Sequence, residues 1–153
     1  AGAVFCGEER TIPELLAFFE GIGSGDAFRR MCVLDAMILN TDRHYGNFGV
    51  LFDTDTLDIR GMAPVFDHNR SLLPELDNDQ LADPAWYLRR CKPRLGQDFI
   101  RNAKGLLTDE IRRDLTDLED FTFQQHPRIH AEQERLDALS EIVQERVCLI
   151  LSD

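Results

Sequence analysis

Lysine is scarce in this chain. Of its 17 basic residues only Lys92 and Lys104 are lysines, and both lie beyond residue 90. The 28 acidic residues give a formal net charge of −11. Binding to a nucleic-acid backbone without sequence preference relies on clustered Lys and Arg that neutralise phosphates. The charge therefore argues against nucleic acid as a direct partner.

Cysteine and long apolar runs are also sparse. Four cysteines are dispersed along the chain without a CxxC pair: Cys6, Cys32, Cys91 and Cys148. A chain of 153 residues does not need disulfide bonds to fold, so we expect a reduced, cytoplasmic protein. No apolar run approaches the roughly 20 residues of a membrane span, and no secretory signal pattern opens the chain. We therefore expect no membrane partner.

The chain has enough apolar residues to build a core. Its hydrophobic fraction is 43% and includes ten Phe, which suits a single domain over residues 1–153. Thr11 and Glu14 form a capping-box pattern at the start of one helix, and Thr108 is a cap for another. The helical pattern covers residues 12–21, 26–40, 95–104, 109–118 and 129–151.

A small sheet interrupts these helices. Two short apolar stretches, 48–52 and 57–59, flank the turn-forming segment 53–56 and predict a β-hairpin. A second short apolar run, 62–66, is expected to be buried. The acidic, turn-rich stretch 74–84 is expected to be an exposed loop. The predicted fold class is mainly α with a small β-hairpin.

A polar loop, 40–47, follows the second helix and carries Asp42, His44 and Asn47. Catalytic groups tend to lie on loops held by rigid elements. Asp42 and Asn47 have the D-x-x-x-x-N spacing of a phosphotransferase catalytic loop, in which the Asp orients the acceptor hydroxyl and the Asn holds Mg²⁺. Asp67 follows after the hairpin and can supply a second hard oxygen, since Mg²⁺ takes one or two protein oxygens besides phosphates and water.

The run Asn40-Thr41-Asp42-Arg43-His44-Tyr45-Gly46-Asn47-Phe48, followed by Ala63-Pro64-Val65-Phe66-Asp67, resembles the C-terminal lobe of HipA-type serine/threonine kinases. The Asp-Arg-His order also resembles phosphatidylinositol kinases. The resemblance is strong over residues 26–73, and the helical tail agrees in kind. It implies the fold of a protein-kinase-like C-terminal lobe.

The resemblance also implies roles and partners. Asp42 would be the catalytic base, Asn47 and Asp67 would hold Mg²⁺, and His44 would contact a phosphate of ATP, the co-substrate. The acceptor would be a Ser or Thr of a protein substrate, and a DNA-binding antitoxin-type partner is a further implication. The acidic loop after Ser71 would occupy the activation-segment position, and its charge points to a basic substrate surface.

The chain departs from a complete kinase before its catalytic loop. Only 41 residues precede Asp42, and none is the lysine that neutralises nucleotide phosphates. The glycines at 21, 23 and 25 follow a predicted helix, where a helix C-terminus explains them, instead of a strand. We therefore expect an N-terminal, ATP-covering lobe to be absent from this chain. On that basis the chain alone has no useful kinase activity.

Two other functions stay open. A non-catalytic protein-binding module with a kinase-lobe fold predicts that Asp42→Ala leaves the biological effect intact. A metal-dependent phosphohydrolase would use Asp42, His44, Asp67 and His68 on a transition metal, because imidazole suits Mn, Fe or Zn better than Mg.

Three further patterns favour ordinary structure. The Asp53-x-Asp55-x-x-Asp58 segment lacks the Gly and Glu of a calcium loop and is typical of a hairpin turn. His126 and His130 have helical zinc spacing, but Pro127 is expected to open a helix between them. The basic stretch 89–94 is expected to be a solvated surface or to contact a partner or an acidic segment.

Overall fold

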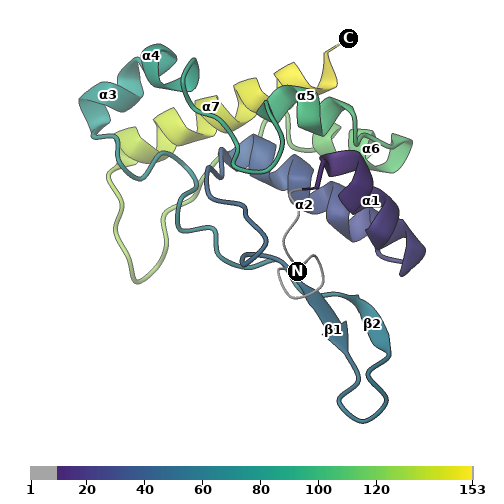
Figure 1. The fold of residues 1–153 in the computed structure, drawn as a ribbon. Coiled ribbons are helices and arrows are strands. Elements are labelled where there is room, and N and C mark those ends of the chain that lie inside the picture. The colour runs from purple at the N-terminus through teal and green to yellow at the C-terminus, as the bar shows by residue number, and fades with distance from the viewer. Residues whose placement is uncertain (1–9, 153) are drawn as a thin grey trace.

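Helices and one two-stranded sheet form the part of the chain that the structure describes, residues 10–152 of a computed structural model (Figure 1). This confirms a mainly α fold with a small sheet. In chain order the elements are α1 (Ile12–Gly21), α2 (Gly25–Ile38), β1 (Val50–Phe52), β2 (Ile59–Met62), α3 (Asn78–Ala82), α4 (Ala85–Leu88), α5 (Phe99–Lys104), α6 (Asp109–Thr116) and α7 (Gln133–Leu151).

The helix caps predicted from the sequence are present. The carboxylate of Glu14 accepts hydrogen bonds from the backbone N–H of Thr11 at 2.8 Å and from its hydroxyl at 2.7 Å. The hydroxyl of Thr108 accepts from the backbone N–H of Ile111 at 3.2 Å. The second predicted helix ends earlier than expected, because Leu39 adopts the left-handed conformation (φ 55°) that terminates α2.

The long helix α7 lies along the helical body, with α2, α5 and α6 beside part of it and α3 near its N-terminal end (Figure 1). Its apolar face joins these helices in the larger of two hydrophobic clusters. The smaller cluster joins α1, α2 and Phe48, the residue that follows Asn47. The candidate loop 40–47 therefore connects a helix shared by both clusters to a buried aromatic anchor. Fully buried residues of the larger cluster include Ala103, Val147 and Ile150.

The hairpin projects away from the helices (Figure 1). Strands β1 and β2 pair antiparallel with Val50 opposite Met62, and the register shifts between Leu51 and Phe52. In the turn, Oδ1 of Asp53 accepts from the backbone N–H groups of Asp55 and Thr56, at 3.0 and 3.1 Å. The predicted β-hairpin is confirmed.

Several sequence predictions are wrong in detail. The stretch 74–84 contains the short helix α3, capped by Asp77, whose Oδ1 accepts from the backbone N–H of Gln80 at 2.9 Å. Leu76 and Leu81 are buried there, so the acidic side chains alternate with core contacts instead of forming a fully exposed loop. Helix α5 begins at Phe99, because Asp98 caps it, and not at residue 95. Helix α7 begins at Gln133, so Pro127 does not open it.

The run 62–66, predicted to be buried, ends in exposed residues. Val65 and Phe66 both lie on the surface, as do Leu51 and Phe52 of the hairpin and Leu57 in its turn. Exposed apolar side chains therefore occur on both the hairpin and the segment that follows it.

The described cysteines, Cys32, Cys91 and Cys148, are free thiols, and Cys6 lies outside the described residues. Burial raises the pKa of Cys91 to about 11, so this group stays a thiol at neutral pH. Within residues 10–152, no helix has the length and apolar character needed to cross a membrane.

Candidate functional site

The candidate loop leaves α2 through a buried asparagine. The amide nitrogen of Asn40 donates to Oδ1 of Asp35 at 2.9 Å, and its amide oxygen accepts from the backbone N–H of Asp42 at 3.2 Å. A buried amide without such partners would cost about 1–3 kcal/mol. These bonds favour a single path for the chain, along which the side chain of Asp42 reaches the surface and is 36% exposed.

Arg43 is the most deeply buried charged residue of the loop, with 1% exposure. Its Nε and Nη2 donate to the two carboxylate oxygens of Asp35 at 2.7 and 2.9 Å, a bidentate ion pair. Its Nη1 donates to the carbonyl oxygens of Asn47 at 2.5 Å and of Phe66 at 2.6 Å. Because Phe66 directly precedes Asp67, one guanidinium connects both segments that carry the predicted site residues.

Sequence reasoning assigned no role to Asp35 or to the side chain of Arg43. The available signal was a carboxylate on a helix that is apolar around most of its circumference, since a buried charge must be paired. The identity of the partner depends on the path of the loop after α2. The sequence pattern therefore indicated a buried charge without indicating its counter-charge.

Asn47 and Asp42 are joined directly. The amide nitrogen of Asn47 donates to the backbone carbonyl of Asp42 at 3.0 Å, and Asn47 is 5% exposed. A metal-binding role would therefore fall to the amide oxygen, on the other side of that group. Asp67 is exposed and has a left-handed backbone (φ 59°), which Asp adopts more readily than most residues. Its connection to the loop is indirect, through the carbonyl of Phe66.

The donor types of Asn47 and Asp67 fit magnesium. One amide oxygen and one carboxylate are what Mg²⁺ takes from a protein when phosphates and water complete its octahedron. Over residues 10–152, no group of three or more His, Cys, Asp and Glu side chains is placed to hold a metal ion. The side chains proposed for a transition-metal centre, including His68, are therefore not brought together as such a group.

The carboxylate of Asp42 is paired with an arginine from a distant segment. Arg94 donates through Nη1 to Oδ1 of Asp42 at 2.8 Å, and Nε2 of His44 lies 3.8 Å from Oδ2. The hydrogen bond from Arg94, together with the positive charge of its guanidinium, lowers the pKa of Asp42. Asp42 is thus ionised at neutral pH and able to accept a proton, with one oxygen occupied. Within the basic stretch 89–94, Arg94 therefore contacts an acidic side chain.

Replacing Arg94 by alanine is expected to raise the pKa of Asp42 toward its ordinary value. The pKa of Asp42 is lower in the folded protein than in the unfolded chain. The Asp42–Arg94 pair therefore stabilises the fold fully at pH values above the unfolded-state pKa. This stabilisation is lost as the pH falls through the pKa of the folded state. An NMR titration of the Asp42 carboxyl carbon measures this midpoint. Arg90→Ala, a change of an exposed arginine in the same stretch, is the control. An Asp42 titration midpoint that is the same in Arg94→Ala and in Arg90→Ala would show that Arg94 does not lower the pKa of Asp42.

The ring of His44 is oriented by Gly46. The backbone N–H of Gly46 donates to Nδ1 at 2.9 Å, so the proton of the neutral imidazole lies on Nε2, the atom nearer Asp42. A Cβ atom at position 46 would lie 2.8 Å from Cε1 of His44. Glycine therefore permits this close approach. An imidazole held in this tautomer can donate a hydrogen bond to a phosphate oxygen.

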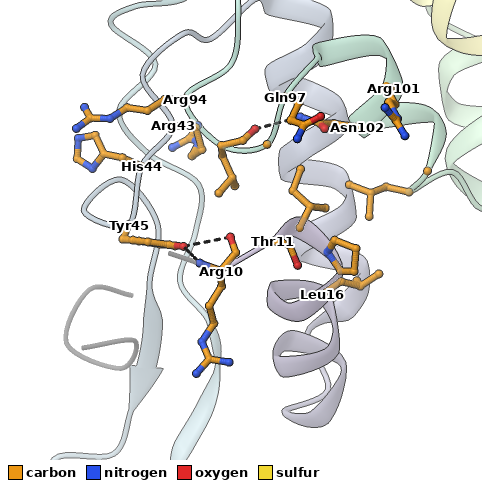
Figure 2. A pocket seen from close by; sticks show the side chains of 16 residues that line it. Arg10, Thr11, Leu16, Arg43, His44, Tyr45, Arg94, Gln97, Arg101 and Asn102 are labelled. Atoms are coloured by element: carbon orange, nitrogen blue, oxygen red, sulfur yellow. Dashed lines mark hydrogen bonds between the residues drawn. The ribbon is translucent and has the colours of Figure 1, made fainter. Parts of the chain in front are cut away.

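A cavity of about 770 Å³ adjoins this loop (Figure 2). Its walls are the N-terminal turn of α1, the loop residues Arg43, His44 and Tyr45, and the segment from Arg94 to Leu106. The hydroxyl of Tyr45 bridges to the backbone of Arg10, accepting from its N–H at 2.6 Å and donating to its carbonyl at 3.2 Å. Sequence reasoning missed this cavity, because its walls come from three separate parts of the chain.

Comparison with protein-family models, with curated proteins and with solved structures finds no match for this chain. What the site can do chemically therefore follows from its own residues and contacts.

Proposed function

We propose that this chain is the catalytic-loop lobe of a HipA-like serine/threonine kinase. Joined to an N-terminal lobe, it would transfer the γ-phosphoryl group of Mg-ATP to a Ser or Thr of a protein substrate. The observation that carries the proposal is the double contact of Arg43 with the carbonyls of Asn47 and Phe66. It links the Asp42-to-Asn47 loop to the residue before Asp67, and so connects the segments that carry the two proposed metal ligands.

Each of the four side chains has a separate role in the proposed phosphoryl transfer. Once Arg94 has released the carboxylate of Asp42, this ionised group orients the acceptor hydroxyl and accepts the proton of that hydroxyl. The Nε2–H of His44 donates to a phosphate oxygen. The amide oxygen of Asn47 and the carboxylate of Asp67 would hold Mg²⁺, whose charge would offset the negative charge of the transferred phosphate.

The exposed apolar surface of the hairpin and of residues 65–66 fits the proposed second lobe. Phe52 and Phe66 are 55% and 44% exposed. A nucleotide-covering lobe packed against these residues would bury both rings, and Phe66 directly precedes Asp67. On this proposal the chain alone lacks the phosphate-binding lysine and transfers phosphate more slowly than the roughly 1 s⁻¹ at the lower end of typical kinase rates.

One observation favours a second candidate, the non-catalytic protein-binding module. Arg94 occupies an oxygen of Asp42 in this structure, and a base that stays paired performs no catalysis. Arg94 is, however, 60% exposed. An exposed ion pair contributes about 0–1 kcal/mol and exchanges readily, so the contact does not prevent Asp42 from acting.

Asp67→Asn is expected to weaken the binding of metal-nucleotide by roughly tenfold or more, because even residues that only support metal ligands change affinity by 10–100-fold. Asn keeps the tolerance for a left-handed backbone and removes the charge. The measurement is a titration with Mn²⁺ and ATP, followed by paramagnetic broadening of the Asn47 side-chain amide signals. Asp120→Asn, a change of an exposed carboxylate after α6, is the matched control. Broadening that is unchanged in Asp67→Asn, or absent from Asn47, would overturn the proposal.

A further inference from the structure

The cavity beside the loop is basic in a strongly acidic chain. Arg10, Arg94 and Arg101 line it together with His44 (Figure 2). Of the described residues, no Asp or Glu lines it, although the chain has 28 of them. Such a concentration of one charge in a concave site favours an anionic ligand.

The positive groups are spread along the cavity and not gathered at one point. In Figure 2, Arg94 and His44 lie at one end and Arg101 lies at the other, with Arg10 along the lower edge. The wall between them combines the apolar side chains of Ile12, Leu16, Leu95 and Leu106 with the uncharged polar side chains of Thr11, Gln97 and Asn102. Positive groups at two ends of one cavity favour a ligand with several anionic groups over a single phosphate. An extended segment with several carboxylates and apolar contacts between them can reach both.

The arginines differ in their availability to a ligand. Arg43 is committed to Asp35 and to two backbone carbonyls, so it contributes to the wall and not to binding. Arg94 holds only the carboxylate of Asp42 and is 60% exposed. Arg101 is exposed, and no described residue pairs with its guanidinium. Arg94 and Arg101 are therefore the groups that an incoming carboxylate can engage.

We propose that this cavity binds an acidic segment of the protein substrate, whose carboxylates pair with Arg101 and Arg94 and so free Asp42 for the acceptor hydroxyl. The part that concerns the acceptor rests on the proposed kinase function. The proposal reverses the expectation of a basic substrate surface, which was drawn from the acidic stretch 74–84. None of that stretch lines the cavity next to Asp42.

The test is fluorescence anisotropy of this chain with a short labelled peptide that has a central serine flanked by glutamates. The glutamate peptide is expected to bind, and the same peptide with glutamine for glutamate is expected to bind more weakly. Arg101→Ala and Arg94→Ala should each weaken peptide binding by about fivefold, which is the loss of affinity expected when one exposed ion pair is removed. Arg90→Ala lies in the basic stretch but outside the cavity and should leave binding unchanged. Thermal melting of each variant establishes that the fold is retained, and Arg101→Gln repeats the test with a longer side chain.

Three results would overturn the proposal. The glutamine peptide could bind as tightly as the glutamate peptide, Arg90→Ala could weaken binding as much as Arg101→Ala, or inorganic phosphate could displace the peptide at matched ionic strength.

The peptide assay contains no nucleotide, so it tests the acidic-segment site separately from the proposed kinase function. Peptide binding without metal-nucleotide binding would leave an acidic-peptide site on a non-catalytic module. Metal-nucleotide binding without peptide binding would retain the kinase lobe and reject this cavity as its substrate site.

Discussion

Asp35→Ala is expected to lower the free energy of unfolding by about 3–5 kcal/mol, the cost of leaving a buried charge without its partner. Asp35 supplies both oxygens of the bidentate pair with Arg43, at 2.7 and 2.9 Å, and also accepts from Asn40. The alanine variant leaves the Arg43 guanidinium buried with only two carbonyl acceptors. Urea denaturation of the wild type and the variant measures the difference.

The matched control is Asp26→Ala, which removes an aspartate from the first turn of the same helix. Asp26 pairs with Arg30 at 2.7 Å, and both side chains are exposed. An exposed pair and a favourable helix-end charge together contribute about 1 kcal/mol or less. A loss from Asp35→Ala no larger than that from Asp26→Ala would show that the buried pair does not hold the loop.

A double variant separates stability from the geometry of the site. Asp35→Leu combined with Arg43→Met removes both charges of this buried pair, and such replacements are often neutral or stabilising. The carbonyls of Asn47 and Phe66 nevertheless lose their donor. The amide of Asn40 also loses its acceptor on Asp35. We therefore expect partial recovery of stability, together with altered backbone amide signals between residues 42 and 48. Native-like signals in the double variant would mean that Arg43 supports folding alone.

The sequence predicted the parts of this site that depend on local order. Thr11 and Glu14 placed the start of α1, and the residue types of 40–47 placed a polar loop after the second helix, in which the amide of Asn47 contacts the carbonyl of Asp42. Short-range rules suffice in both cases, because the partners lie within five residues of each other.

The contacts that the sequence did not predict join distant segments. Arg94 reaches Asp42 across 52 positions, and Arg43 reaches Phe66 across 23. These pairings depend on how the helices pack, which no periodicity in one segment encodes. Helix α3 was missed for a different reason: the Asp77-to-Gln80 capping box was present in the sequence, but the surrounding acidic and turn-forming residues favoured a loop.

Phe28→Ala is expected to destabilise the protein by about 3–5 kcal/mol, through lost transfer free energy and the cavity left behind. Phe28 has no exposed surface. Its ring stacks on Phe19 with centroids 5.0 Å apart and an interplanar angle of 12°, and lies 6.2 Å from the ring of Phe48. Because Phe48 directly follows Asn47, the loss also reaches the end of the candidate loop.

The control for this change is Phe52→Ala on the hairpin, where the ring is 55% exposed. Surface substitutions of this kind stay within about 0.5 kcal/mol. Phe28→Leu should fall between the two, since it keeps part of the buried volume. Denaturation midpoints rank the three variants, and the side-chain amide signals of Asn47 report on the loop. If Phe28→Ala changes the denaturation midpoint and the Asn47 amide signals no more than Phe52→Ala does, the aromatic cluster does not hold Asn47 beside Asp42. The hydrogen bonds of buried Arg43 would then be the principal restraint on the site.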